Sequence, residues 1–279
     1  MNTNVPTLLY NNADEIKKIT NLICDVLHPE MIVLFGQYAG MPPTNILGGY
    51  EFLILCRETS PVLLRELRHY INLHLTMEER QEKSLSLNLF SVDLVIHKSY
   101  LSYFLLTIRQ QGILLYTNNR YNLLEKIRFR PQRIYEHTLK QTARCLSMGK
   151  AFLENARYNR EQKTWPLTAF HLYQAAVQLM QAIMFAHFGF IPNASEDLLT
   201  FYSHIRYCSE ELNGLWDGDN NLSGWRFFSR LQQFHKQALS SGEFYTSPVL
   251  LSDCLERAHL LLLAAENFCQ EKLSFLKSL

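Results

Sequence analysis

Apolar positions in the first part of the chain switch between helical spacing and short continuous runs. Ile16, Ile19 and Ile23 recur at helical spacing, which predicts a helix over residues 14–27. A second helix is predicted over residues 61–76. Short apolar runs predict four buried strands, at residues 31–35, 52–55, 91–96 and 113–116. Strands that alternate with helices predict a mixed domain of the α+β class.

The strand pattern stops after about residue 122, and only helical spacing follows. Helices are predicted over residues 131–161, 166–187, 195–211, 225–239 and 247–276. Pro166 suits a helix start, because the first turn can spare its N–H. The 279 residues are enough for two domains. We therefore expect an α+β domain over residues 1–125 and an all-α, up-and-down helical bundle over residues 126–279.

The strongest chemical signal lies between the first two predicted strands. The first strand ends at Gly36-Gln37, and a loop rich in glycine and proline follows. The second strand opens with Gly49-Tyr50-Glu51, and Asp93 falls on the predicted strand 91–96. This order resembles the minimal nucleotidyltransferases of the polymerase-beta-like superfamily. Their pattern is a strand, Gly-Ser, a loop, Asp-x-Asp opening the next strand and a third Asp on a later strand.

The resemblance implies a nucleotide site at Gly36 and Gln37, with Glu51 and Asp93 as metal ligands and, in an active enzyme, as catalytic residues. Carboxylates two positions apart on a strand point to one face, so an Asp-x-Asp pair can hold Mg²⁺ on a triphosphate. Here Gly49 replaces the first acid, and Gln37 replaces the serine. Glu51 and Asp93 alone suit one weakly held Mg²⁺ on a bound nucleotide. The pattern therefore indicates a degenerate active site with impaired transferase chemistry.

The helical half carries a second motif at residues 169–176, Ala-Phe-His-Leu-Tyr-Gln-Ala-Ala. This stretch resembles the second helix of HEPN domains, which are often fused to such nucleotidyltransferases. A plain amphipathic core helix is the alternative interpretation. Active HEPN ribonucleases carry Arg-x(4–6)-His on a late helix, and Arg230 with His235 matches that spacing. The register of the family instead places the motif near residues 238–244, which contain neither residue type. HEPN relatives also imply a homodimer formed through the bundle.

Charge and cysteine content limit the possible partners. Lys and Arg number 27 against 26 Asp and Glu, a net charge of +1, which gives little support to RNA as a partner. No apolar run approaches the roughly 20 residues that span a membrane. The six cysteines are scattered without zinc spacing, which favours free thiols and a cytoplasmic location.

Three functions remain open from the sequence. The first is a nucleotide-binding or partner-binding regulatory protein, of a toxin–antitoxin or stress-response type, that has lost efficient transfer. The second is an active Mg²⁺-dependent nucleotidyltransferase that uses Glu51 and Asp93 to modify a protein or a small molecule. The third is a HEPN ribonuclease that uses Arg230 and His235. A nucleoside triphosphate is the expected ligand of the first two, and whether the protein is an enzyme stays open at this stage.

Overall fold

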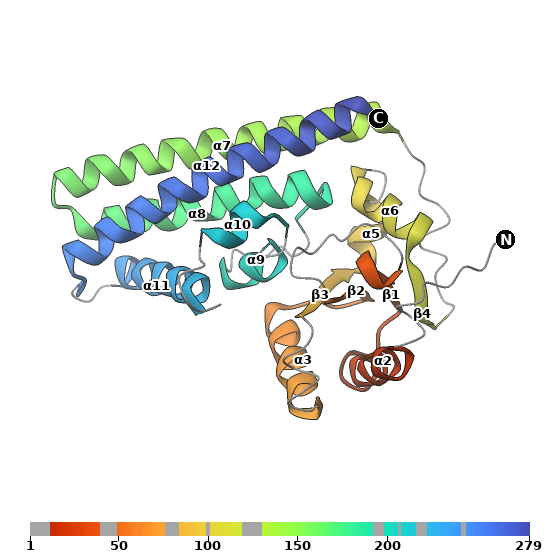
Figure 1. Cartoon of the computed structure of the whole chain (residues 1–279). Coiled ribbons are helices and arrows are strands. Elements are labelled where there is room, and N and C mark those ends of the chain that lie inside the picture. The colour runs from red at the N-terminus through yellow and green to blue at the C-terminus, as the bar shows by residue number, and fades with distance from the viewer. Residues whose placement is uncertain are drawn as a thin grey trace. The chain divides into compact units, whose positions relative to one another are not determined.

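The computed structural model describes residues 12–39, 49–75, 84–98, 101–118, 130–191, 198–205, 208–215, 222–240 and 244–279. The chain divides into two compact units (Figure 1). One comprises residues 1–130 and 192–195, and the other comprises residues 131–191 and 196–279. The boundary predicted between residues 125 and 126 lies outside the described residues.

The first unit is built on a four-stranded sheet in the order β3-β2-β1-β4. The strands are β1 (Met31–Phe35), β2 (Gly49–Cys56), β3 (Ser84–Ser91) and β4 (Ile113–Thr117). Strand β1 runs antiparallel to both β2 and β4, whereas β2 and β3 run parallel. The mixed sheet confirms the predicted α+β class, and β1, β2 and β4 confirm three of the four predicted strands.

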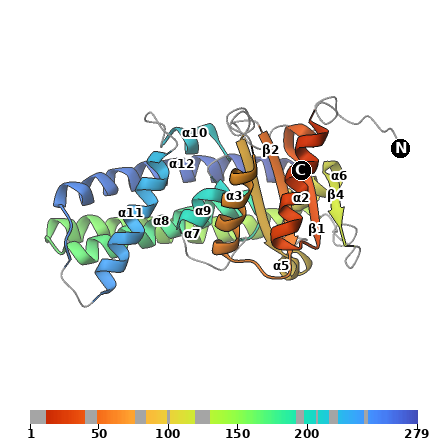
Figure 2. The same cartoon turned by 90° about the horizontal axis from the view of Figure 1, so that it is seen from below.

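Two helices cover each face of this sheet (Figures 1 and 2). Helices α2 (Ala13–Leu27) and α3 (Pro61–His74) pack on one face. Their Ile19, Ile23 and Leu67 side chains join one buried cluster with alternate residues of β1, β2 and β3. Because strand side chains alternate between faces, the residues between these apolar positions point to the other face.

The opposite face carries two short helices, α5 (Val92–Lys98) and α6 (Tyr103–Gln111). The ring of Phe104 on α6 packs edge-on against Phe35 of β1, with ring centroids 5.4 Å apart. It also lies 6.1 Å from the ring of Phe90 on β3. These aromatic contacts attach α6 to the sheet face that contains Glu51.

The strand predicted at residues 91–96 is wrong. The structure places the strand at Ser84–Ser91, and residues 92–98 form helix α5. Leu94 N donates to Ser91 Oγ at 3.1 Å, a helix-capping contact. Val92 and Val95 are then buried three positions apart on one side of the helix, whereas Asp93 in its first turn is exposed. The spacing of Val92 and Val95 therefore fits one buried side of a helix rather than a strand.

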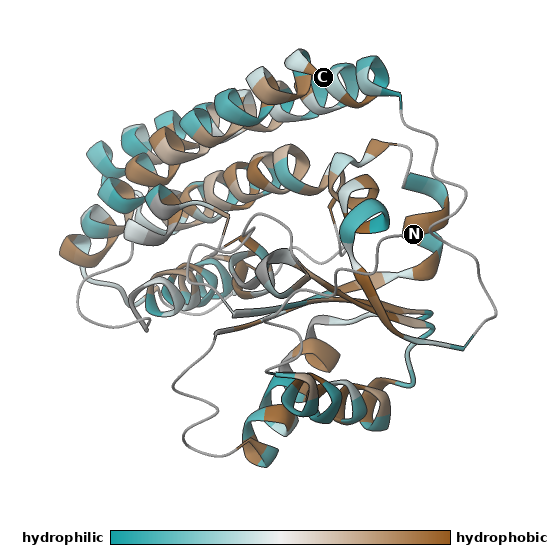
Figure 3. Ribbon diagram, turned by 45° about the vertical axis from the view of Figure 1, so that its right-hand side comes forward, coloured by the Kyte–Doolittle hydropathy of each residue, from teal (hydrophilic) through white to brown (hydrophobic). Residues whose placement is uncertain are grey.

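The second unit is a helical bundle, as predicted. Its long helices are α7 (Pro131–Glu161), α8 (Trp165–Phe188), α11 (Leu222–Leu239) and α12 (Pro248–Ser278). Helix α8 contacts α7, α11 and α12 and is apolar around most of its surface, as a central helix should be. Hydrophilic and hydrophobic residues instead alternate along α7 and α12, which each have a solvent-facing side (Figure 3).

The helix predicted over residues 195–211 is two shorter helices. Helix α9 (Leu198–Ile205) ends before Cys208, and α10 (Glu210–Gly214) follows. Leu212 N donates to Ser209 Oγ at 3.0 Å, which caps the start of α10. A second capping residue inside the predicted span therefore divides it.

All six cysteines are free thiols, as predicted, and four of them are buried. Burial raises the pKa of Cys56 and of Cys269 to about 12, so both stay protonated at neutral pH. No helix among the described residues is both long and apolar enough to cross a bilayer.

Candidate functional site

Gly36 and Glu51 meet where β1 ends beside β2. Gly36 has φ +73°, a conformation that favours glycine. An ideal Cβ built on Gly36 would lie 1.9 Å from Oε1 of Glu51. The Glu51 carboxylate therefore packs directly against the glycine backbone. Gln37 follows in a short 3-10 helix, η1 (Gly36–Ala39), so the structure keeps Gly36, Gln37 and Glu51 in one place.

Glu51 is buried beside two neutral polar side chains. Its neighbour across the β2–β3 ladder is Ser86, and Asn88 lies two residues further along the same face. All three residues are buried, and Asn88 Nδ2 donates to Ser86 Oγ at 3.3 Å. We call Glu51, Ser86 and Asn88 the polar row. It contains one carboxylate where a metal-binding transferase site needs several.

Gly49 stands where the nucleotidyltransferase motif has its first aspartate, so no carboxylate is present at this position. Its backbone conformation also disfavours substitution by any residue that has a Cβ. Its φ is +137°, which is strained for any residue with a Cβ. The next residue, Tyr50, points to the opposite face, where its hydroxyl donates to Glu15 on α2. Its ring lies 4.6 Å from that of Tyr38 in η1. These contacts fix the start of β2 to α2.

Asp93 lies at the other end of the sheet from Glu51. In the parallel β2–β3 pair, Glu51 is opposite Ser86, near the start of both strands, whereas Ser91 is opposite Cys56 at their last residues. Asp93 follows Ser91 and is exposed on α5. The structure therefore does not bring the two predicted carboxylates together.

A second buried carboxylate in this unit has a structural role. Glu30 precedes β1, and its Oε1 accepts a hydrogen bond from Arg57 Nε at 2.6 Å. Its Oε2 accepts one from the amide of Asn118 after β4. Its backbone N–H donates to the carbonyl of Leu55, at 2.8 Å. Glu30 thus ties three strands together at the end of the sheet remote from Gly36.

The donor set does not fit a magnesium centre formed by the chain. Among the described residues, no group of three His, Cys, Asp or Glu side chains is placed to hold a metal ion. The polar row supplies one carboxylate together with a hydroxyl and an amide, which cannot form a two-metal clamp. Sequence reasoning missed Ser86 and Asn88, although the strict alternation of leucine with serine and asparagine over residues 85–89 signals a strand.

The motif at residues 169–176 lies on α8 in the centre of the bundle. Ala169, Ala175 and Ala176 are fully buried, so neighbouring helices can approach α8 closely. His171 is half-buried between aromatic rings, 5.4 Å from that of Phe170 and 5.9 Å from that of Phe152. Burial lowers the pKa of His171, so the neutral ring is favoured at this position.

Arg230 and His235 of α11 face different helices. A guanidinium nitrogen of Arg230 lies 3.8 Å from Asp253 on α12. His235 stacks on Tyr173 of α8, with ring centroids 3.9 Å apart and 11° between the ring planes. Side chains five positions apart on an α-helix point to different sides of the helix, as Arg230 and His235 do. The Arg-x(4–6)-His spacing therefore does not form a joint site within the chain.

The family model of the HEPN domain matches residues 142–268. The match includes residues 169–176 and supports the HEPN resemblance predicted from them. The mixed sheet of the first unit and the helices of the second confirm the predicted fold class, an α+β unit followed by an all-α bundle.

Comparison with solved structures finds spectinomycin adenyltransferase AAD(9) from Enterococcus faecialis, with ATP and spectinomycin. The sequences are 11% identical, the match covers 90% of this chain and 99% of that chain, and the TM-score is 0.31. A search of curated protein sequences found no significant match.

Proposed function

We propose that this protein is a binding and regulatory protein whose nucleotidyltransferase-like unit no longer transfers nucleotidyl groups efficiently. The observation that carries the proposal is the polar row, in which Ser86 and Asn88 stand beside the single carboxylate of Glu51. In-line transfer depends on metal ions that neutralise the attacking and leaving oxygens, and several carboxylates normally hold them. One buried carboxylate cannot replace that set.

The position of Glu51 also bears on nucleotide binding. In the proposed ancestral site, phosphates approach the backbone at Gly36, where the absence of a side chain leaves room for them. Here the Glu51 carboxylate occupies the space against that backbone and repels an anion. We therefore propose weak nucleotide binding, with any Mg²⁺ carried in by the nucleotide phosphates rather than held by the protein.

Titration calorimetry with ATP, GTP, CTP and UTP tests the binding part, each in Mg²⁺ and again in EDTA. We expect at least one nucleotide to bind, with dissociation constants above about 100 μM. Silence for all four would remove nucleotide recognition and leave a protein partner as the ligand. Glu51→Gln should tighten binding, because it removes the negative charge beside Gly36 while keeping the shape of the side chain.

A second assay addresses catalysis. Incubation with nucleotides labelled at the α-phosphate, together with protein and small-molecule acceptors, should give no label transfer above background. Transfer that Glu51→Gln abolishes would overturn the proposal and establish an active nucleotidyltransferase. Asp93→Asn is the matched control: it lies at the far end of the sheet, so it should change neither binding nor transfer.

The proposal includes a homodimer formed through the bundle, in a regulatory system such as a toxin–antitoxin pair. Leu260 and Leu263, on successive turns of α12, are 49% and 55% exposed and suit such a contact. Light scattering after gel filtration should give twice the chain mass, and Leu263→Arg should give a monomer. A monomeric wild-type protein would contradict the dimer without affecting the proposal for the first unit.

A further inference from the structure

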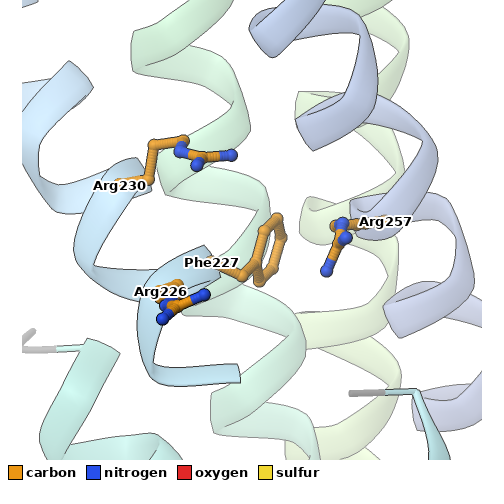
Figure 4. A pocket seen from close by; sticks show the side chains of 4 residues that line it. All are labelled: Arg226, Phe227, Arg230 and Arg257. Carbon is orange, nitrogen blue, oxygen red and sulfur yellow. The ribbon is translucent and has the colours of Figure 1, made fainter. Parts of the chain in front are cut away.

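Three arginines converge on a small pocket between α11 and α12. The pocket has a volume of about 200 Å³ and is lined by Arg226, Phe227, Arg230 and Arg257. The guanidinium groups of Arg226 and Arg230 lie on one side of the Phe227 ring, and that of Arg257 lies on the other (Figure 4).

The surrounding carboxylate neutralises only part of this charge. Asp253 accepts a hydrogen bond from Arg257 Nε at 3.3 Å and lies 3.8 Å from Arg230. No carboxylate among the described residues pairs with Arg226. Among the described residues, three guanidinium groups at the pocket are thus paired with one carboxylate. Arg226 and Arg230 are also four residues apart on α11, where like charges repel.

The pocket is partly organised before any ligand arrives. Phe227 is buried, with only 3% of its surface exposed, and it packs against the ring of Phe228. Arg230 lies beside the Asp253 carboxylate of α12, at 3.8 Å. The buried Phe227 ring excludes water from one side of the pocket. This strengthens the attraction between the guanidinium groups and an anion. Guanidinium groups match phosphate oxygens in two-pronged hydrogen bonds.

We propose that this pocket binds the phosphate group of a small phosphorylated molecule, such as a mononucleotide or a sugar phosphate. Its volume lies below the roughly 300 Å³ of typical small-molecule sites, so it suits a phosphate and the atoms next to it. The net charge of +1 provides no broad field for a long polyanion. The site differs from the Arg-x(4–6)-His pair, because His235 faces α8 instead. It is also independent of the polar row.

The experiment is titration calorimetry on the full-length protein in EDTA, at constant ionic strength. The probes are inorganic phosphate, AMP and ribose 5-phosphate, with chloride as the background anion. Arg226→Gln and Arg257→Gln remove one guanidinium each, and Lys236→Gln removes an exposed charge from α11 outside the pocket. Lys98→Gln, at an exposed position of α5, is the control in the first unit. Circular dichroism establishes that each variant is folded.

We expect saturable binding of AMP or ribose 5-phosphate, and weaker binding of inorganic phosphate. Each arginine substitution should weaken it at least about tenfold, because a charge-assisted hydrogen bond is lost. Lys236→Gln and Lys98→Gln should bind as the wild type does. Equal binding by the arginine variants, or no binding of any probe, would overturn the proposal. Tight binding of a single-stranded RNA with a steep salt dependence would also overturn it, in favour of a polyanion surface.

Discussion

Each unit has a glycine against which a side chain from another element packs closely, Gly36 in the first unit and Gly149 in the bundle. The packed side chain is charged in the first case and apolar in the second. In the first unit, Gly36 has a positive φ and meets the buried carboxylate of Glu51. In the bundle, Gly149 lies within helix α7, and an ideal Cβ on it would lie 2.7 Å from the Cδ2 methyl of Leu179 on α8. A methyl group at the end of a flexible apolar chain can move within a core. A carboxylate that packs directly against the backbone has fewer ways to adjust.

The comparison shows that a close approach to glycine has a different character in each unit. In the first unit, a buried carboxylate lies against a backbone with a positive φ. In the bundle, an apolar side chain packs on a glycine within a helix, as in an ordinary core. The same substitution at the two glycines should therefore change stability by different amounts.

The two units can be followed separately in one sample. Trp165, Trp216 and Trp225 all belong to the second unit, and the first unit has no tryptophan. Tryptophan fluorescence thus reports unfolding of the bundle, whereas far-ultraviolet circular dichroism reports both units. The predictions below use this difference.

The largest effect is expected for Gly36→Ala. A left-handed alanine costs about 1–2 kcal/mol, and the contact with Glu51 adds about 1–3 kcal/mol, for a total near 3 kcal/mol. The circular dichroism transition of the first unit should move to lower urea, while tryptophan fluorescence stays unchanged. In the double variant with Glu51→Ala, the loss should be smaller than the sum of the two single losses. Simple additivity would mean that the two residues are not in contact.

His187 on α8 should make the bundle acid-sensitive. Burial, with Lys272 and His204 nearby, lowers the pKa of His187 to about 3. The unfolded chain, with a pKa near 6.5, takes up the proton first as pH falls, so stability declines from about pH 6.5 towards pH 3. The loss between pH 7 and pH 5 should be about 2 kcal/mol by urea unfolding followed with tryptophan fluorescence. His187→Gln should remove this dependence, and His97→Gln in the first unit should keep it.

His235→Ala should destabilise the bundle by about 1.5 kcal/mol, because the ring stacked on Tyr173 is lost. His235→Phe, which keeps a stacked ring, should cost less. Both losses should be visible in the fluorescence transition. RNA cleavage by the wild type that His235→Ala abolishes would contradict this structural role.

The smallest effect is expected for Gly149→Ala. Alanine gains about 1 kcal/mol of helix propensity, and displacement of Leu179 costs a similar amount, so the net change should stay within about 1 kcal/mol. The same substitution as at Gly36 thus tests the comparison between the units directly. A loss of unfolding free energy as large as that of Gly36→Ala would show that Leu179 cannot move aside within the bundle, and would contradict the comparison.

Long periodic segments could be predicted from the sequence, whereas positions set by contacts between strands could not. The spacing of apolar residues predicted α2 and α7 to within about a residue, since a helix determines its own buried side. The place of Asp93 depends on where β3 ends, and that is decided by pairing with β2 and by the Ser91 cap. Local sequence cannot reveal that Ser86, rather than an acid, lies beside Glu51.

The conformation of Gly49 has an evolutionary consequence. Two of the four glycine codons become aspartate codons through a single base change. At φ +137°, however, the new side chain would strain the backbone. The backbone at the start of β2 would have to change at the same time. Gly49 therefore acts as a barrier: an acid at this position is within reach of the genetic code but carries a cost in stability.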